Sequence, residues 1–464
     1  MIERRQLGGT DGFRGEATTE RGPGRMNWET LAGLTYALVM EGTDGEGGGR
    51  IAIGRDTRSS GQYLQSAAIA GATFAGAEVY WLDIAPTPTV LRTAAELELD
   101  AAVVITASHN KDKDNGWKGT KGGNKPYGDQ VTAIDNRYWD QVESGLVIPS
   151  VGNRATRLRT ELVIDYENDL VQSVENIFGQ RPLEGKWIVV DAANGAAMGV
   201  APRVMKQLGA NVVEYACDGS KLINDGCGAT DLGGVQQFMR EHPSLARLPG
   251  FLGVLAYDGD ADRFIGMGVD TEGEEMNFHE LEGNRVMELL APGQPGVVGT
   301  EYTNCASIER LKADGIDFGM CPNGDVEVTR MLRKLGWNRG SEFTGHHVDL
   351  SWLSSGDGVR TGAMIAALAA SNGTNFAEMS KNLPLWPEKM RNLKVRSGMG
   401  ASALASVLDL LVVSDQDAAA GLRLVVRESG TEKDSMRVWA SGQDGKRVDE
   451  VTQQIVDGMM EYAV

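Results

Sequence analysis

Cysteines and long apolar runs are scarce in this sequence. It has only four cysteines in 464 residues, and no two of them form a C-x-x-C pair, so neither a disulfide framework nor a structural zinc site is expected. No stretch reaches the roughly 18 uninterrupted apolar residues of a membrane span. The first residues are polar and lack the apolar core of a signal peptide. We therefore expect a cytoplasmic protein without a membrane partner.

Basic residues are outnumbered as well. The chain has 45 Lys and Arg against 64 Asp and Glu, which gives a net charge of −19. Because proteins that bind nucleic acid need a basic surface, no nucleic-acid partner is expected. An anionic small molecule would need arginine, lysine, backbone N–H groups or a metal gathered at one place. Most of the acidic residues need no role beyond solubility.

The chain is too long for a single hydrophobic core, since such cores stop growing near about 250–300 residues. Short apolar runs alternate with helix-like runs, which is the order typical of a parallel sheet. Strands are expected at 50–54, 79–82 and 102–105, and helices at 61–75 and 131–142.

This pattern restarts twice further along the chain. One restart is the strand expected at 186–191, and the other is the strand at 252–257, followed by a strand at 264–269 and a helix at 280–290. Three α/β domains of about 100–150 residues each would account for the restarts.

The C-terminal end differs from the rest. A helix is expected at 404–411, strands at 422–426 and 436–440, and a final helix at 448–460. This order indicates a smaller α+β domain. The expected domains are 1–148, 149–250, 251–371 and 372–464.

Ser108 follows an apolar strand in the segment Thr106-Ala107-Ser108-His109-Asn110. Ligands of open α/β sheets bind at the carboxyl ends of strands, and a serine hydroxyl can carry a phosphoryl group as a covalent intermediate. His109 and Lys118 are nearby in sequence as proton carriers. A polar turn in which Ser and Asn cap a helix explains this segment equally well. A serine hydrolase is disfavoured because Ser108 lies in no G-x-S-x-G elbow.

Three carboxylates recur at every second position in Asp258-Gly-Asp260-Ala-Asp262. In an extended chain they would point the same way and repel each other. A hard cation such as Mg²⁺ would remove that conflict. A solvated acidic turn is the simpler reading, but the triplet directly follows an apolar strand. A calcium-binding EF-hand is excluded, because Arg263 and Val269 stand where its glycine and glutamate are required.

The same triplet would also fit a phosphatase, with Asp258 as nucleophile and Asp260 as acid/base. That reading leaves the Ser108 segment without a role. Two further segments suit a phosphosugar. Arg427-Glu-Ser429-Gly-Thr431 offers a guanidinium, hydroxyls and backbone N–H groups to phosphate, although it also reads as a hairpin loop. Ser341-Glu-Phe-Thr344-Gly-His346 offers hydrogen-bonding groups to sugar hydroxyls.

In this order and spacing, the four segments resemble the α-D-phosphohexomutase family over nearly the whole chain. The opening Gly9-Thr-Asp-Gly-Phe-Arg14-Gly15 and the segment Gly54-Arg-Asp-Thr-Arg58 are similar to further family motifs. The resemblance implies three related α/β domains with mainly parallel mixed sheets and a smaller α+β domain around a central cleft. It places the phosphoserine loop in the first domain, the metal and sugar loops in the third, and a phosphate-binding loop in the fourth.

The resemblance also implies roles for individual residues. One Mg²⁺ per chain would be held by the phosphoserine oxygen of Ser108 and by three carboxylates, those of Asp258, Asp260 and Asp262. The implied catalytic residues are Ser108, His109, Lys118 as general base, and Arg14 as a phosphate contact. The implied substrate-binding residues are Arg263, Glu342, Thr344, His346, Arg427, Ser429, Gly430 and Thr431.

Within the family, the stretch 218–231 looks most like the phosphoglucosamine branch, although Ala229 and Asp231 replace the usual serine and histidine. The phosphate loop has Glu428 in place of the usual proline. The sugar loop has Ser341 where glycine is usual and Thr344 where serine is usual, and Phe343 adds bulk. Glu432-Lys433 also replaces the usual Glu-Pro. These departures concern recognition of the sugar and its phosphate rather than the transfer chemistry.

The implied activity is that of an isomerase interconverting glucosamine 6-phosphate and glucosamine 1-phosphate. Transfer would pass through a phosphoserine enzyme and a 1,6-bisphosphate, which also serves as the priming activator. The only expected partner is a phosphohexose or phosphohexosamine, and the chain is expected to be a monomer or a homodimer. Three alternatives stay open: a glucose- or mannose-phosphate mutase, the Mg²⁺-dependent phosphatase, and a non-catalytic sugar-phosphate-binding protein motivated by Glu428 and Ser341.

Overall fold

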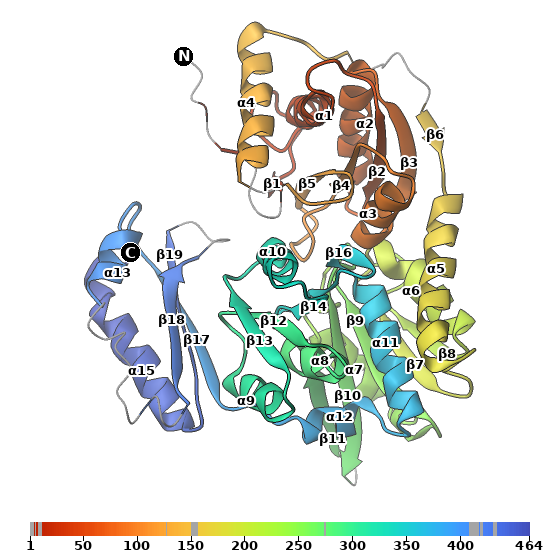
Figure 1. Ribbon diagram of the computed structural model, residues 1–464, viewed down its shortest axis with the longest axis vertical. Helices are drawn as coiled ribbons and strands as arrows, with labels where there is room; N and C mark the ends of the chain where they lie inside the picture. The colour runs from red at the N-terminus through yellow and green to blue at the C-terminus, as the bar shows by residue number, and fades with distance from the viewer. Residues whose placement is uncertain are drawn as a thin grey trace.

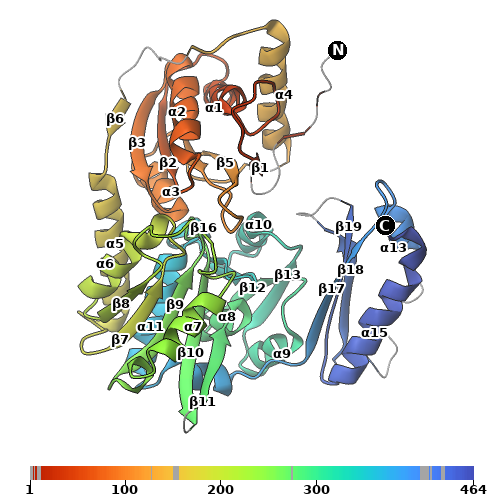
Figure 2. The same ribbon diagram turned by 180° about the vertical axis from the view of Figure 1, so that it is seen from behind.

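A computed structural model describes residues 4, 6–7, 12–126, 128–149, 156–272, 275–407, 417, 421–429 and 434–464. These described residues form four β-sheets, three with helices packed against mixed strands and a small fourth one at the C-terminus. In Figure 1 the first sheet lies at the top, the second and third lie below it, and the C-terminal sheet stands to one side. Figure 2 shows the same arrangement from behind. The expected fold class is confirmed.

The first sheet is six-stranded, with the order β1-β5-β4-β2-β3-β6. Its strands β2, β3, β4 and β6 are parallel, and β5 and β1 are antiparallel to their neighbours. The elements are β1 (Phe13–Glu16), α1 (Trp28–Gly42), β2 (Arg50–Arg55), α2 (Gly61–Phe74), β3 (Glu78–Ile84), α3 (Thr87–Glu96), β4 (Ala101–Ile105), β5 (Asp114–Lys121), α4 (Asp129–Ser144) and β6 (Thr156–Leu158).

The middle strands of this sheet are buried on both faces. Val103 and Ile105 of β4 pack into the core beneath α1 and α2, whereas Ala102 and Val104 pack into the core that continues through α3. Because both faces are covered, the strand reads as an uninterrupted apolar run in the sequence. The run ends at Ile105, and the polar Ser108 segment follows at the carboxyl edge of the sheet.

The second sheet has the order β11-β10-β9-β7-β8. Its elements are α5 (Glu161–Phe178), β7 (Trp187–Asp191), the 3₁₀ turn η1 (Ala196–Met198), α6 (Val200–Gln207), β8 (Asn211–Tyr215), α7 (Gly233–Glu241), η2 (Leu245–Arg247), β9 (Phe251–Tyr257), β10 (Phe264–Glu272) and β11 (Glu275–Leu281). Strands on both sides of residue 250 share this sheet, which therefore runs across the boundary expected there. The metal loop, 258–263, is the turn between the antiparallel strands β9 and β10 of this second sheet.

The third sheet has the order β13-β12-β14-β15-β16. Its elements are α8 (Gly283–Leu290), β12 (Gly296–Thr300), α9 (Cys305–Ala313), β13 (Asp317–Cys321), α10 (Asp325–Leu335), β14 (Arg339–Ser341), β15 (His347–Asp349) and β16 (Leu353–Gly356). The helices that follow, α11 (Gly358–Ser371) and α12 (Phe376–Asn382), pack against strands of the second sheet. The helix expected at 280–290 begins only at Gly283, because the Glu282 carboxylate caps it and the residues before it pair with β10.

The C-terminal sheet has the order β17-β19-β18. Its elements are β17 (Glu388–Lys394), α13 (Gly400–Ala405), β18 (Arg423–Glu428), β19 (Ser435–Ser441), α15 (Gly445–Gly458) and η4 (Met460–Tyr462). The expected helix 404–411 overlaps α13 only at residues 404 and 405, because α13 ends at Ala405 and a turn follows. Residues 408–411 lie outside the described residues. Strand β17 was not expected from the sequence. Among the described residues, no helix combines the length and the apolar character needed to span a bilayer.

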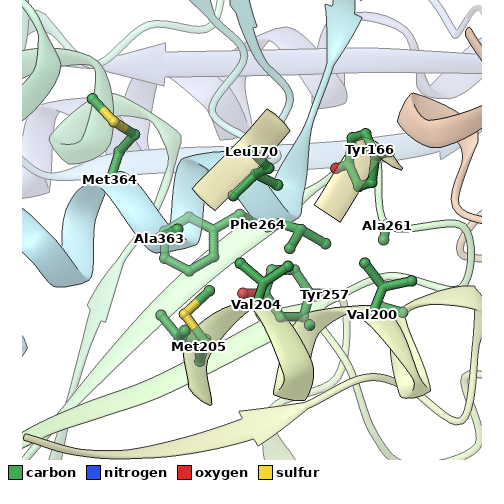
Figure 3. Close-up of a cluster of buried hydrophobic side chains, with 14 of the residues drawn as sticks. Tyr166, Leu170, Val200, Val204, Met205, Tyr257, Ala261, Phe264, Ala363 and Met364 are labelled. Atoms are coloured by element: carbon green, nitrogen blue, oxygen red, sulfur yellow. The ribbon is translucent and has the colours of Figure 1, made fainter. Parts of the chain in front are cut away.

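Buried hydrophobic side chains fix the position of the metal loop. Tyr257 ends β9, Ala261 lies in the loop and Phe264 begins β10, and all three side chains are fully buried. Figure 3 shows them packed together with Tyr166 and Leu170 of α5, with α6 side chains and with Ala363 and Met364 of α11. Both ends of the metal loop are therefore fixed by packing between helices that are distant in sequence.

Candidate active site

Ser108 lies at the carboxyl end of β4 in a left-handed backbone conformation, with φ of +55°. Such a conformation is uncommon for serine and persists only where neighbours hold it. Its N–H donates to Thr106 Oγ1 (2.8 Å), and the Thr106 hydroxyl donates to Asp56 Oδ2 (2.6 Å). Its hydroxyl donates to Asp258 Oδ2 at 2.7 Å. The structure therefore points the serine oxygen of the first sheet at the metal loop of the second.

Arg58 holds the loop that carries Ser108. Its side chain is fully buried and donates through all five of its N–H groups. Nε pairs with Asp56 at 2.9 Å, and the four terminal N–H groups donate to the carbonyl oxygens of Ser108, Asn110, Lys111 and Asp114 at 2.6–2.9 Å. A buried guanidinium is tolerated only when its donors are satisfied. Arg58 thus fixes the loop from 108 to 114.

Asn224 supports the same loop from the second sheet's side of the site. Its Nδ2 donates to Ser108 O (2.8 Å) and to Asn110 O (3.0 Å). The close approach needs Gly259, because a side-chain carbon at that position would lie 2.7 Å from Ser108 O and 2.9 Å from Asn224 Nδ2. The segment around residue 224, singled out in the sequence for its branch resemblance, therefore contacts the Ser108 loop directly.

Asp258, Asp260 and Asp262 converge at this site, although not in the way expected. The loop is a turn rather than an extended strand, with Ala261 at φ of +57°. One carboxylate oxygen from each aspartate nevertheless lies within 4.8 Å of the others, and all three residues are buried. Asp260 Oδ1 is buried and has no hydrogen-bond partner among the described residues. Three buried carboxylates with an open oxygen fit a hard divalent cation.

Two cationic groups offset the charge of the triad. Lys118 Nζ, on β5, lies 2.6 Å from Asp260 Oδ2 and 2.9 Å from Asp262 Oδ2. His346 Nε2 lies 2.9 Å from Asp262 Oδ1, and its Nδ1 bonds to the Glu342 carboxylate. Thr87 also contributes, because its hydroxyl donates to Asp260 Oδ2 and its N–H to Asp260 O. Side chains from three sheets therefore meet on the metal loop.

These contacts shift the pKa values of the buried groups. Burial and the charges of Asp262 and Asp260 raise the pKa of Asp258 to about 7. Burial would likewise raise the pKa of Asp262, but Lys118 and His346 outweigh it and hold that pKa well below its usual range. Burial opposes the charge of Lys118, yet Asp260 and Asp262 raise its pKa. The site thus contains buried acidic and basic side chains in direct contact, and their pKa values are shifted.

His109 adjoins the serine, and Arg14 and Arg263 are close enough to His109 to affect its charge. His109 Nδ1 lies 3.4 Å from Ser108 Oγ. Burial, followed by the charges of Arg263 and Arg14, lowers the pKa of His109 to about 3. Arg14 lies on β1, opposite Gly116 of β5. The N–H of Arg263 donates to Asp258 Oδ1 at 3.1 Å. Among the predicted catalytic residues of the first domain, His109 thus contacts Ser108, Lys118 contacts the aspartates, and Arg14 acts on His109 through its charge.

The sugar loop, 341–346, joins β14 to β15 and lies against the metal loop. Arg263 and His346 form a β-bridge. Burial would lower the pKa of His346, but Asp262 and Glu342 outweigh burial and raise that pKa to about 10. The Thr344 hydroxyl makes no hydrogen bond within the described part of the chain, and the residue is half-buried. Ser341 Oγ bonds to His347 Nδ1 at 2.6 Å, which ties the two ends of the loop together.

The phosphate loop begins at the end of β18 of the C-terminal sheet, and its described residues, 427–429, make no contact with Ser108. Arg427 lies within β18, where Nε donates to Tyr302 Oη at 2.8 Å and lies 2.9 Å from Glu301 Oε1. The Ser429 N–H donates to Ser435 O at 2.7 Å. Gly430 and Thr431 lie outside the described residues. Tyr302, the partner of Arg427, also packs edge-on against Phe343 of the sugar loop, with ring centres 5.9 Å apart.

Several residues at the site were not singled out from the sequence. Arg58 and Asp56 were recognised only as part of a motif, and Asn224 only as part of a branch-specific stretch. No sequence motif indicated Thr87 or Tyr302, because their contacts join segments that are far apart in the chain. Long-range contacts of this kind are not encoded in local spacing.

Two family models match the chain. Residues 5–143 match "Phosphoglucomutase/phosphomannomutase, alpha/beta/alpha domain I" and residues 282–385 match domain III of the same family. A phosphoglucosamine mutase of Ralstonia nicotianae is 34% identical over 97% of this chain and 98% of the relative. Another, from Streptomyces griseus, is 30% identical over 97% and 98% of the two chains.

Solved structures agree on the fold. A phosphoglucomutase/phosphomannomutase family protein from Burkholderia thailandensis superposes with a TM-score of 0.77 at 20% identity, covering 100% of this chain and 99% of that one. An N-acetylphosphoglucosamine mutase of Aspergillus fumigatus, solved with GlcNAc-6P and magnesium, superposes with a TM-score of 0.60 at 16% identity over 100% and 96% of the chains. From these matches and the near-complete coverage of its relatives, the chain belongs to the phosphoglucomutase/phosphomannomutase family.

Proposed function

We propose that this protein is a phosphoglucosamine mutase, which interconverts glucosamine 6-phosphate and glucosamine 1-phosphate through phospho-Ser108. The observation that carries the proposal is the 2.7 Å contact between the Ser108 hydroxyl and Asp258 inside a buried aspartate triad. The relatives of 30–34% identity that span nearly the whole chain bear the same activity in their names. This supports glucosamine over glucose and mannose.

The triad is the proposed Mg²⁺ site. Asp258, Asp260 and Asp262 would hold the ion together with an oxygen of phospho-Ser108. The bound ion supplies positive charge to the transferring phosphoryl group. A magnesium-bound relative in the same fold supports this choice, as does the buried, unpartnered Oδ1 of Asp260.

The transfer takes two steps, with a 1,6-bisphosphate between them. The sugar O1 attacks the phosphorus of phospho-Ser108, the bond from phosphorus to Ser108 Oγ breaks, and the proton of the O1 hydroxyl passes by way of a proton carrier to Ser108 Oγ. After the bisphosphate has turned, Ser108 Oγ attacks the 6-phosphoryl group, the bond to O6 breaks, and the serine proton passes by way of a proton carrier to O6. His109 and Lys118 are the proposed proton carriers. Phosphoryl transfer otherwise depends on positioning and charge neutralisation.

The remaining residues orient the substrate. Glu342, Thr344 and His346 are proposed to contact sugar hydroxyls, and the free hydroxyl of Thr344 supports this. Arg14 and Arg263 are proposed to contact the phosphoryl group at Ser108. Arg427, Ser429, Gly430 and Thr431 are proposed to hold the other phosphate, which a guanidinium and successive N–H groups suit. A 1,6-bisphosphate would prime the enzyme, and a relative solved with glucose 1,6-bisphosphate supports that ligand class.

A primed assay with three substrates tests the function. Glucosamine, glucose and mannose 6-phosphates are each supplied with their 1,6-bisphosphate, and the products are followed by phosphorus NMR. We expect the glucosamine compound to turn over fastest, and Ser108→Ala to abolish all three reactions. Faster turnover of glucose or mannose phosphate would refute the substrate. Activity that survives in Ser108→Ala would instead favour the phosphatase with Asp258 as nucleophile.

A further inference from the structure

The C-terminal sheet docks on one turn of the third sheet. This turn, residues 301–304, directly follows β12. Arg423 donates to the carbonyl oxygens of Glu301 and Thr303, at 2.9 Å each. Arg427 reaches the side chains of the same turn, with Nε 2.8 Å from Tyr302 Oη and 2.9 Å from Glu301 Oε1. The two arginines of β18 therefore bind this turn in different ways, one through its backbone and the other through its side chains.

The Arg427 contact is the one that bears on the reaction. A guanidinium binds a carboxylate and a phosphate with the same geometry and the same charge complementarity. The partners are only partly buried, with side-chain exposures of 29% for Arg427 and 23% for Glu301. A phosphate arriving from solvent can therefore replace Glu301 without opening a hydrophobic core.

Tyr302 keeps Arg427 in place while that exchange occurs. Its ring is 1% exposed and packs edge-on against Phe343 of the sugar loop at 5.9 Å and against Trp439 of β19 at 5.8 Å. The guanidinium carbon of Arg427 lies 5.4 Å from the centre of the same ring. Tyr302 is therefore a fixed, neutral partner, whereas Glu301 is a charged partner that phosphate can displace.

We propose that Glu301 is a positioning residue that occupies Arg427 in the place of substrate phosphate and competes with it. This inference rests on the proposed function in one respect, namely that Arg427 takes the phosphate distal to Ser108. A bisphosphate that has to turn must be released and bound again by this arginine. When the phosphate leaves, the Glu301 carboxylate takes its place on Arg427, so the arginine always has an anionic partner. Release of the phosphate therefore costs less free energy than it would without Glu301.

Glu301→Gln tests the competition. The change keeps the shape of the side chain and removes its charge. Binding of glucose 1,6-bisphosphate is measured by calorimetry in a Ser108→Ala background, so that no transfer occurs. We expect the dissociation constant to fall about three- to fivefold, the range that a partly exposed ion pair implies. Glu309→Gln, which removes an equal charge from an exposed glutamate paired with Lys312 on α9, should leave it unchanged.

A gain in affinity is a result that structural damage does not produce. Binding that is unchanged or weaker in Glu301→Gln overturns the proposal, provided that the melting temperature matches that of Glu309→Gln. The same measurement with Arg427→Lys added separates local from general effects. The gain should vanish there, and a gain that persists would show that Glu301 acts without Arg427 and would refute the mechanism. Failure of the proposed function shows itself separately, as absence of turnover in the unaltered enzyme.

Discussion

We expect Lys118→Met to make the stability of the folded protein depend on the proposed Mg²⁺. Lys118 is 4% exposed and contacts Asp260 at 2.6 Å and Asp262 at 2.9 Å. Methionine has a similar length but no charge, so the aspartates lose their nearest cation. Breaking a buried ion pair by removing one partner costs about 3–5 kcal/mol. In a domain of this size that corresponds to a fall in Tm of about 10 °C when EDTA is present.

Magnesium should restore much of this loss. A ligand at a hundred times its Kd stabilises the folded state by about 2.7 kcal/mol. The gain should exceed that of the unaltered protein, because Lys118 no longer competes with the cation for Asp260 and Asp262. The assay is thermal unfolding of both proteins in EDTA and in MgCl₂. Lys113→Met, at an exposed lysine 4.0 Å from Glu16, is the control and should melt like the unaltered protein.

An equal rise of Tm with magnesium in Lys118→Met and in the unaltered protein would show that Lys118 does not compete with the cation, and the prediction fails. It is also refuted if the substitution lowers Tm in EDTA by less than about 2 °C, since a lost buried ion pair cannot cost so little.

Three further changes probe the supports of the site. Arg58→Lys can replace at most three of five buried hydrogen bonds, so we expect a loss of about 3 kcal/mol in urea unfolding, against less than about 1 kcal/mol for Arg55→Lys at the partly exposed pair with Asp83. Asn224→Ala removes two bonds to the Ser108 loop and should lower kcat about tenfold with little effect on KM; an unchanged kcat contradicts this. Burial raises the pKa of Asp191 to about 7, so its contribution is fully present below pH 4 and is lost as pH rises towards 7. Asp191→Asn should flatten the measured decline of stability over that range, and an undiminished slope would argue against it.

The serine and the aspartate triad could be predicted because each follows a buried strand. Ser108 comes after β4, and Asp258 after β9. An apolar run that ends in polar residues is visible in the sequence alone. The local geometry was less predictable. The triad was expected on one face of an extended chain, whereas its carboxylates converge because a turn with Ala261 in a left-handed conformation folds them together.

Contacts between sheets could not be predicted. Nothing in the spacing indicates that Asn224 reaches the carbonyl of Ser108 or that Arg427 binds Glu301. Strand β17 was missed for a related reason. Its sequence, EKMRNLK, alternates weakly and is only partly buried, and it forms a strand because it pairs along its whole length with β19. Tertiary pairing of this kind overrides local propensity.

The immobility of the Ser108 loop has a consequence for which molecules can be isomerised. Arg58 and Asn224 hold the serine carbonyl and Thr106 holds its N–H, so the serine cannot swing from one end of a sugar to the other. The carbohydrate has to pivot instead. A branched or bulkier hexose could accept the first phosphoryl group and still fail, stalled as a doubly phosphorylated product that has no room to rotate. We therefore expect that sugars are selected during this rotation as well as during binding.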